Sequence, residues 1–210
     1  MKTALIWGAS GGMGRALVTR LDREAWTVLG VSRHPDDLLD LTPHTFEADV
    51  TDSEQVAHVV EGARRVVPEV DLFVYAAGTI ASERVKRMDA ETWHRVIGAN
   101  LTGAFLTTQA SLPLLASDAH LVYLGAYDDR LRMPGLTAYA ASKAGLEAFT
   151  DALAKEQRRL RVTLVRPPAV DTAFWDLVPF KLPSGALTPE EVADRILEAY
   201  DAEHSGLLDL

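Results

Sequence analysis

The chain has 210 residues, of which 48% are hydrophobic, so it is long enough to bury a substantial core and too apolar to be a disordered tail. Its formal net charge of −9 opposes non-specific binding to nucleic acid or to an anionic membrane. It has no cysteine, which excludes disulfides and thiolate chemistry, and its six histidines lack the spacing of metal ligands, so we expect no metal centre.

The N-terminal apolar run is too short for a signal peptide and leads directly into a glycine-rich turn. No segment approaches the roughly 18 to 20 apolar residues of a membrane span. We therefore expect a cytoplasmic protein that binds neither nucleic acid nor membrane.

Short apolar runs that alternate with helical patterns predict an α/β protein. The runs expected to be strands are residues 3–7, 27–32, 45–48, 71–76, 121–125, 161–166 and 206–210. Helices are expected to begin near Gly12, Ser53, Asp89, Ala138 and Thr188. Thr188 and Glu191 have the spacing of a capping box. Strands separated by helices form a doubly wound parallel sheet of about seven strands with helices on both faces, and the absence of linkers or repeats predicts a single domain over residues 1–210.

The first predicted strand runs into Gly8-Ala-Ser-Gly-Gly12-Met-Gly14, which opens an amphipathic helical stretch. Glycines allow a tight turn and the close approach of a pyrophosphate, and free amides at the helix start supply donors and a positive dipole. This order predicts a dinucleotide site, although the spacing Gly-x-x-x-Gly-x-Gly differs from the commonest fingerprint. The alternative is a tight strand-to-helix connection without a ligand.

The second predicted strand ends at Ser32 and Arg33, about 20 positions after the glycine turn, where an acidic residue would hold the ribose hydroxyls of NAD. A serine does not repel a 2′-phosphate, and a guanidinium can grip one through a forked, charge-assisted contact. We therefore expect a preference for NADP(H), with use of NAD(H) left open. The alternative is that Arg33 only faces solvent at a strand end.

Tyr139 and Lys143 lie four residues apart in a predicted helix, which brings a phenol and an ammonium onto one face, about 5 to 6 Å apart at Cβ. A fixed cation favours phenolate and lowers the phenol pKa from about 10, which suits an acid or base at neutral pH. The pair is therefore a candidate for proton transfer. Taken alone, it also fits a surface helix in which Tyr139 packs and Lys143 is solvated.

Residues 171–187 form the one sizeable irregular segment of the chain and follow the sixth predicted strand. Ligands of parallel sheets bind beyond the carboxyl ends of the strands, so this segment is placed to cover a substrate. The alternative is a plain surface connection.

These motifs follow one another in an order that resembles the short-chain dehydrogenase/reductase family along nearly the whole chain. The resemblance is carried by the glycine spacing, Asp49-Val50, the turn Ala76-Ala77-Gly78, Asn100 in a helix, Tyr139 with Lys143, and Val165-Arg-Pro-Pro-Ala-Val-Asp-Thr172. It implies a Rossmann fold and an NAD(P)-dependent oxidoreductase acting on a small-molecule substrate.

The resemblance also implies roles for individual residues. Tyr139 would exchange a proton with the substrate, Lys143 would lower its pKa and hold the nicotinamide ribose, and Asn100 would anchor a water relay behind Lys143. Asp49 and Val50 would contact the adenine. The other cofactor contacts are Gly8, Ser10, Gly11, Gly12, Met13, Gly14, Ser32, Arg33, Ala76, Ala77, Gly78, Pro167, Val170 and Thr172.

Two places depart from the family's pattern. The family has a serine near the end of the fifth strand, thirteen residues before the tyrosine, whereas this chain has Ala126 preceded by Gly125. That hydroxyl donates to the oxygen on which charge develops, and losing one such donor costs about 10²- to 10³-fold in rate, roughly 3 to 4 kcal/mol. The family's two asparagines before the Ala-Gly pair are replaced by Tyr75 and Ala76, so the local hydrogen bonding must differ.

Three functions are compatible with Ala126. The one we favour is an NADPH-dependent reductase of a small carbonyl, quinonoid or imine-like substrate, which needs little oxyanion support or receives it from another group such as Tyr127. Strand alternation would turn Tyr127 to the opposite face unless the strand has ended. Dihydropteridine reductases, which also lack the serine, are the precedent for a quinonoid substrate. The others are a carbonyl or alcohol oxidoreductase of low activity and a non-catalytic NADP(H)-binding sensor or structural partner.

The helical patterns over 91–115 and 138–160 carry apolar residues on more than one face. These residues are Ile97, Leu101, Phe105, Leu112, Leu146, Phe149 and Leu153. In the resembled family these two helices pair across a two-fold axis, so we expect a homodimer or homotetramer, the alternative being a wholly intramolecular core. The substrate site is expected to take its shape from residues 126–136 and 171–187.

Overall fold

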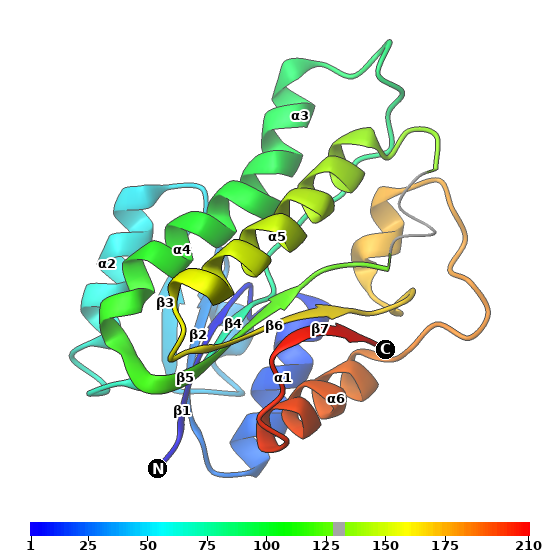
Figure 1. Cartoon of the computed structure of the whole chain (residues 1–210). Helices are drawn as coiled ribbons and strands as arrows, with labels where there is room; N and C mark the ends of the chain where they lie inside the picture. The colour runs from blue at the N-terminus through cyan, green and yellow to red at the C-terminus, as the bar shows by residue number, and fades with distance from the viewer. Residues whose placement is uncertain (128–132) are drawn as a thin grey trace.

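A computed structural model describes residues 1–127 and 133–210 of the chain. Within them, seven parallel strands form one sheet in the order β3-β2-β1-β4-β5-β6-β7 (Figure 1). In chain order the strands are β1 (Thr3–Trp7), β2 (Thr27–Ser32), β3 (His44–Glu47), β4 (Val70–Tyr75), β5 (Leu115–Leu124), β6 (Arg161–Arg166) and β7 (Gly206–Asp209). The predicted doubly wound α/β fold is therefore confirmed, and the strand order reverses between the neighbours β1 and β4.

Helices cover both faces of the sheet (Figure 1). On one face, α1 (Gly12–Arg23) packs beside α6 (Pro189–Asp201). The other face carries α2 (Ser53–Ala63), α3 (Ala90–Ile97), α4 (Gly103–Ser111) and α5 (Thr137–Glu156). The remaining turns are η1 (Pro35–Leu38), η2 (Gly98–Thr102), η3 (Leu112–Leu114) and η5 (Ala173–Leu177). No helix in the described part of the chain is long and apolar enough to cross a bilayer.

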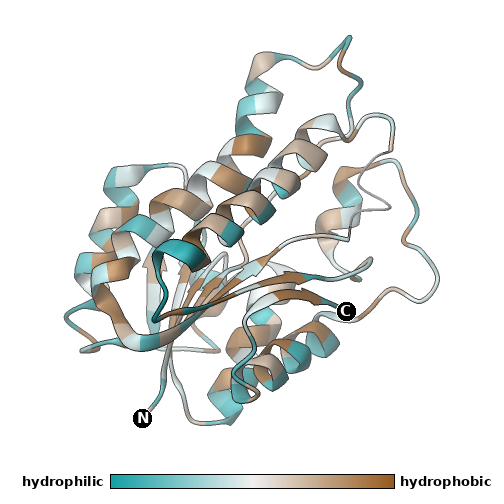
Figure 2. Cartoon of the chain, viewed as in Figure 1, coloured by the Kyte–Doolittle hydropathy of each residue, from teal (hydrophilic) through white to brown (hydrophobic). Residues whose placement is uncertain are grey.

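The core has two large apolar layers, one on each face of the sheet, and a smaller cluster that contains Tyr139. In β1, Leu5 and Trp7 point into the layer beneath α2, α4 and α5, whereas Ala4 and Ile6 point into the layer beneath α1 and α6. Because successive side chains of a strand point to opposite faces, a strand covered on both faces must be apolar throughout. Figure 2 shows the same pattern, with brown along the strands and teal on the outer surfaces of the helices.

The predicted helix starts agree with the structure to within one residue. Asp89 N-caps α3, because its carboxylate accepts from the backbone N of Thr92 at 2.7 Å. The predicted capping box begins α6: the hydroxyl of Thr188 accepts from the backbone N of Glu191 at 3.2 Å, and the carboxylate of Glu191 accepts from the backbone N of Thr188 at 2.7 Å. Local sequence signals therefore define these ends.

Two predicted elements differ from the structure. Strand β5 begins at Leu115 instead of residue 121, because Leu115 pairs with Val70 of β4 although the residues that follow it are largely polar. The helix predicted over 91–115 is interrupted by η2, a π turn that separates α3 from α4. The early start of β5 depends on its pairing with β4, which a local pattern does not contain.

Candidate active site

The glycine turn lies where the loops after β1 and β4 meet. Gly8 has a φ of +84°, and a Cβ there would lie 2.5 Å from the backbone N of Ala77, so no larger residue fits. A Cβ on Gly14 would collide with the carbonyl oxygen of Gly8. Gly11 N-caps α1 and Gly12 begins it, so the unpaired amides of the first helical turn belong to the same tight loop.

A pair of serine hydroxyls joins this loop to the end of β2. The Oγ atoms of Ser10 and Ser32 lie 2.5 Å apart, and the Oγ of Ser32 accepts from the backbone N of His34 at 3.0 Å. Ser32 is buried and Arg33 is exposed. The strand end therefore combines a hydrogen-bonded hydroxyl with an exposed guanidinium. Their binding of a 2′-phosphate stays a prediction.

Asp49 and Val50 follow β3. The Oδ1 of Asp49 accepts from the backbone N of Thr51 at 2.8 Å and from its Oγ1 at 2.7 Å. Partial burial acts to raise the pKa of Asp49, but these hydrogen bonds and the charge of Arg33 outweigh it and hold the pKa below its ordinary value. Asp49 is therefore ionised at neutral pH. Val50 lies against the start of α4, where a Cβ on Gly103 would meet it.

Asn100 is fully buried in the π turn η2, and its side-chain amide makes three hydrogen bonds. Its Oδ1 accepts from the backbone N of Thr79 at 2.8 Å, and its Nδ2 donates to Thr79 O at 2.8 Å and to Ser142 Oγ at 2.9 Å. Gly78 comes so close that a Cβ there would lie 2.7 Å from the Oδ1 of Asn100. The loop after β4, which includes Ala76 and Gly78, is therefore tied through Asn100 to α5.

Tyr139 and Lys143 lie one turn apart near the start of α5, and both are buried. The Nζ of Lys143 lies 5.6 Å from the centroid of the Tyr139 ring and donates to Leu124 O at 2.7 Å. Burial lowers the pKa of Lys143 to about 8. Ser142 connects the pair to Asn100, since its Oγ donates to Tyr139 O at 2.7 Å. The structure thus brings the three predicted catalytic side chains into one buried cluster.

The ionisation of Tyr139 runs opposite to the prediction. Burial raises the pKa of its phenol above the ordinary value. The cause is desolvation, because a buried phenolate would lose its hydration, while the ammonium of Lys143 donates to the Leu124 carbonyl. Tyr139 is therefore protonated at neutral pH, which is the state that a proton donor needs.

The irregular segment 171–187 covers Tyr139. Phe174 lies against it, with the ring centroids 5.8 Å apart, and Val178 and Phe180 join the apolar cluster that surrounds the phenol. These contacts help to bury Tyr139, which is 9% exposed.

The chain after β6 returns to the glycine turn. A Cβ on Gly12 would lie 2.5 Å from the Cγ2 of Thr172, so Thr172 sits directly against the start of α1. Its hydroxyl N-caps η5 by accepting from Phe174 N at 3.4 Å. Val170 forms an isolated parallel bridge with Leu187. Thr172 thus joins the start of the segment 171–187 to the glycine turn, and Val170 directly precedes that segment. Their contact with a cofactor stays a prediction.

Ala126 and Tyr127 lie beyond the end of β5, so strand alternation does not govern them. Ala126 packs against the apolar cluster that contains Tyr139. Tyr127 is 42% exposed, its backbone N donates to Pro167 O at 3.2 Å, and its ring centroid lies 5.9 Å from the Cζ of Arg166. Residues 128–132, part of the stretch expected to shape the substrate site, lie outside the described residues.

Sequence reasoning missed three residues of this site: Ser142, Thr79 and Phe174. Ser142 directly precedes Lys143 in the motif, and its spacing of three from Tyr139 is a signal that could have found it. Thr79 contributes its backbone N–H and C=O, and Phe174 lies in a segment without periodicity. Neither has a signal of its own, although the segment 171–187 that contains Phe174 was expected to cover a substrate.

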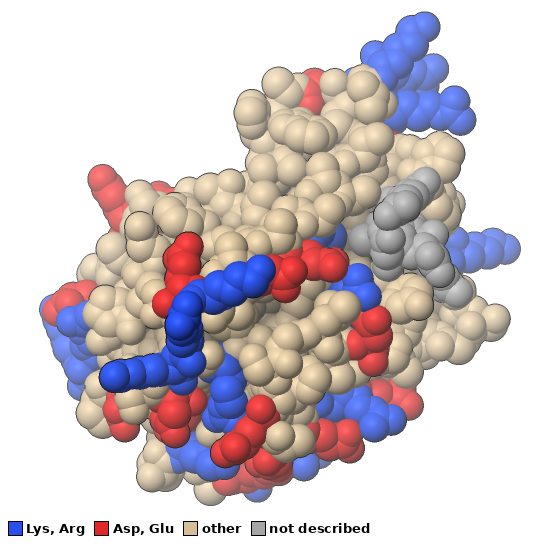
Figure 3. Space-filling model, in the orientation of Figure 1, with Lys and Arg blue, Asp and Glu red and all other residues tan. Residues whose placement is uncertain are grey.

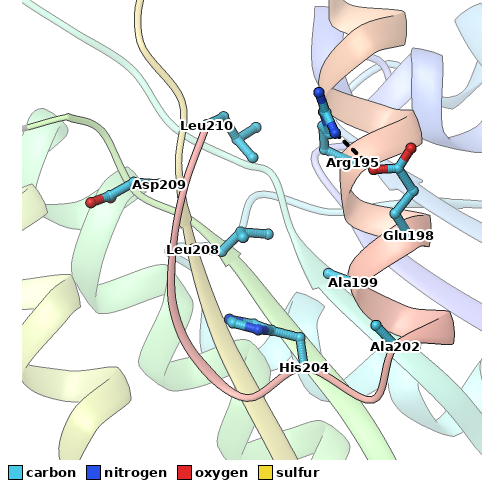
Figure 4. A pocket seen from close by; sticks show the side chains of 8 residues that line it. All are labelled: Arg195, Glu198, Ala199, Ala202, His204, Leu208, Asp209 and Leu210. Carbon is cyan, nitrogen blue, oxygen red and sulfur yellow. Dashed lines mark hydrogen bonds and ion pairs between the residues drawn. The ribbon is translucent and has the colours of Figure 1, made fainter.

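A pocket of about 460 Å³ lies elsewhere, between α6 and β7 (Figure 4). Its walls include the ion pair of Arg195 and Glu198, whose charged atoms lie 3.1 Å apart, and the side chain of Leu208. None of the predicted site residues is among those that line it, so this pocket is not the candidate site.

Known proteins resemble this chain in sequence and in fold. The family model for short chain dehydrogenases matches residues 2–179. The 3-oxoacyl-(acyl-carrier-protein) reductase FabG of Thermotoga maritima is 32% identical, over 93% of this chain and 89% of that protein. A short chain dehydrogenase from Shigella flexneri complexed with NADP has a TM-score of 0.90 and 26% identity, over 99% of this chain and 96% of that chain. An alcohol dehydrogenase from Thermococcus sibiricus complexed with 5-hydroxy-NADP has a TM-score of 0.91 and 26% identity, over 100% of this chain and 96% of that chain. The glycine turn, the buried tyrosine–lysine pair and these similarities lead to one conclusion: the chain belongs to the short chain dehydrogenase family of oxidoreductases.

Proposed function

We propose that this chain is an NADPH-dependent oxidoreductase that transfers a hydride to a small carbonyl, quinonoid or imine-like substrate, with Tyr139 as the proton donor. The observation that carries the proposal is the buried cluster in which Tyr139, Lys143 and Asn100 are held together. Lysine is almost never fully buried without a partner or a function, because burial disfavours its charge. A lysine with a pKa lowered to about 8 beside a buried phenol is typical of a catalytic site.

The residues of the glycine turn fit a dinucleotide. Gly8 and Gly14 leave no room for side chains, so a ligand at this turn would meet backbone amides at the start of α1. Arg33 and Ser32 offer a cation and a hydroxyl to a 2′-phosphate. The similar proteins from Shigella and Thermococcus were complexed with NADP and an NADP derivative. Bound NADPH would supply the hydride.

Tyr139 would supply the proton. Burial keeps its phenol protonated at neutral pH, so the hydroxyl can donate to the oxygen or nitrogen of the group that is reduced. As the proton leaves, a phenolate forms near the ammonium of Lys143, which stabilises it. Asn100 holds the start of α5 through Ser142 and thereby keeps Tyr139 in place.

The surroundings of Tyr139 favour a small substrate with an apolar body. Phe174 lies against the ring of Tyr139, and Val178 and Phe180 pack against the same apolar cluster. Ala126 contributes a methyl group to the same cluster where the family has a hydroxyl. A substrate that builds little negative charge on the reduced group, such as a quinonoid or imine-like acceptor, therefore fits better than a simple ketone.

Following NADPH oxidation against ketones, quinones, pterins and imines tests the proposal. We expect turnover with at least one class, and a loss of about 10²- to 10⁴-fold in Tyr139→Phe, which keeps the ring and removes the proton. Tyr200→Phe, a change in α6 away from the site, is the matched control. Tight NADPH binding without oxidation of any substrate would instead support a non-catalytic sensor or structural partner.

We also propose that the chain forms a homodimer or homotetramer through α4 and α5, and that it is cytoplasmic. Among the apolar residues that suggested assembly, Leu146 and Leu153 are buried within the chain and offer no surface. Phe105 of α4 is 45% exposed. Figure 3 shows few charged side chains over α3 and α4, whereas charges are dense near α1 and α6. Helix α4 has no charged residue, and an outer face that exposes a phenylalanine suits an interface between copies.

A further inference from the structure

The phenol of Tyr75 is hydrogen-bonded to the turn that carries Asn100. Tyr75 ends β4, is 1% exposed, and donates from its hydroxyl to the carbonyl oxygen of Ala99 at 2.6 Å. Ala99 directly precedes Asn100 in η2. In this π turn the backbone N of Gly103 donates to Gly98 O, one residue further back than in an α-helix. The sheet thus supplies a hydrogen bond to the π turn that separates α3 from α4.

The helix makes room for this phenol. A Cβ on Gly103, the first residue of α4, would collide with the hydroxyl oxygen of Tyr75. Burial, with a smaller contribution from the charge of Asp49, raises the pKa of Tyr75 far above its ordinary value. The hydroxyl therefore stays protonated and remains a donor throughout the working pH range.

The same turn supports the catalytic cluster from behind. Asn100 binds the backbone N–H and C=O of Thr79 and donates to Ser142 Oγ at 2.9 Å, and Ser142 donates to Tyr139 O at 2.7 Å. A continuous series of short hydrogen bonds and peptide links therefore runs from the hydroxyl of Tyr75 to the backbone of Tyr139. A shift of η2 would move the amide of Asn100 away from both of its partners.

We propose that Tyr75 is a positioning residue, whose hydroxyl holds the π turn where the amide of Asn100 can support Tyr139 and Lys143. The expected effect of this hydroxyl on the catalytic rate rests on the proposed function. Its expected effect on the structure of η2 does not. The phenol takes the place of an asparagine of the family's pattern and is long enough to reach from the end of β4 to the backbone of the helix.

Tyr75→Phe tests this role, and Tyr123→Phe is the matched control. Tyr123 of β5 is as deeply buried, and its hydroxyl shares a hydrogen bond of 2.6 Å with Thr108 of α4, away from η2. We expect Tyr75→Phe to lower kcat about tenfold, because a weakly held turn misplaces Asn100, and to leave the KM for NADPH unchanged. Tyr123→Phe should keep the kcat of the wild type. An equal kcat for both variants would contradict the proposal.

A double-mutant cycle separates positioning from a general loss of stability. In the Asn100→Ala background, Tyr75→Phe should cause no further loss of kcat, since the residue through which it acts is gone. An additive loss would show that Tyr75 acts by another route.

Amide hydrogen exchange gives a readout that needs no turnover. Exchange within Gly98–Thr102 should accelerate in Tyr75→Phe and stay at the wild-type rate in Tyr123→Phe. Unchanged exchange in this turn would overturn the proposal. So would a Tyr75→Phe variant that fails to fold, because the hydroxyl would then serve the whole core. If the wild type oxidises no substrate, the proposed function fails, and the exchange measurement still decides this inference.

Discussion

At the residue scale, the site is defined by two ionisable groups taken out of water. Burial lowers the pKa of Lys143 to about 8 and raises the pKa of Tyr139, so the lysine loses its proton before the phenol does. The ordinary pKa values of the two side chains are nearly equal, about 10.5 and 10. At neutral pH the chain therefore presents a phenol with its proton and a cation ready to stabilise the phenolate.

The burial of Lys143 makes stability depend on pH. Below about pH 8 the lysine is protonated in both the folded and the unfolded chain, and the folded chain bears the cost of a buried charge. Between about 8 and the ordinary value of 10.5 the folded chain releases the proton while the unfolded chain keeps it, so the free energy of unfolding rises with pH. Relative to Lys143→Met, the wild type should gain up to about 3 kcal/mol across this window. Urea unfolding of the wild type and of Lys143→Met at several pH values measures this gain. A difference in unfolding free energy between the two proteins that stays constant with pH would contradict the prediction.

Arg33 is expected to decide between the two nicotinamide cofactors. Arg33→Ala removes a charged hydrogen-bonding partner of the 2′-phosphate, which is worth about 1.5 to 3 kcal/mol, or roughly 10- to 100-fold in Kd for NADPH. Binding of NADH should be unchanged, because NADH lacks that phosphate. Fluorescence titration measures the Kd for NADPH and the Kd for NADH. Arg158→Ala, which changes an exposed arginine beyond α5, is the control. An NADH efficiency equal to or above that of NADPH in the wild type would refute the preference.

At the element scale, the functional groups lie at the places where helices begin or change. The glycine turn opens α1, Tyr139 lies in the first turn of α5, and Asn100 lies in the π turn between α3 and α4. Helix starts leave backbone donors unpaired, and a π turn alters the direction of side chains within a helix. At these positions backbone N–H and C=O groups are free to bind other partners, whereas in a regular helix interior they pair with each other.

The capping box of α6 gives a prediction about stability alone. Thr188→Ala removes the side chain that accepts from the backbone N of Glu191, so the free energy of unfolding should fall by about 1 kcal/mol. Thr188→Ser keeps the hydroxyl and should behave like the wild type. Urea unfolding compares the three proteins. A Thr188→Ala variant as stable as Thr188→Ser would show that the cap contributes nothing.

At the scale of the whole molecule, the topology brings distant residues to one edge of the sheet. All strands are parallel, so the loops after β1, β2, β4, β5 and β6 meet at the carboxyl edge. Thr172 thereby touches Gly12, and Thr79 touches Asn100, although each pair is far apart in the chain. The position of the site residues therefore depends on the strand order, which brings these loops together.

The exposed face of α4 predicts assembly. We expect light scattering at micromolar concentration to show a dimer or tetramer, and Phe105→Glu to shift it toward monomer, because a carboxylate would be buried at the interface. Val66→Glu changes a residue that is 40% exposed beyond α2 and serves as the control. A wild-type chain that is only monomeric under these conditions would remove the expectation.

Much of the fold was predictable because its signals are local. The period of apolar residues located the strands, and Asp89, Thr188 and Glu191 marked helix starts that the structure reproduces to within one residue. The early start of β5 was not predictable in this way, since the pairing of Leu115 with Val70 joins residues that no short window contains.

For the site, the sequence by itself determined which chemical groups are available: glycines that permit a tight turn, a guanidinium after β2, and a tyrosine and a lysine on one helix face. Only the tertiary structure decided how they behave. Burial reversed the expected direction of the Tyr139 pKa, η2 turned Asn100 toward Thr79 and Ser142, and the chain after β6 placed Phe174 over the phenol. Spacing along a helix depends on backbone geometry that every sequence shares, whereas desolvation and hydrogen-bond partners depend on which distant segments pack together.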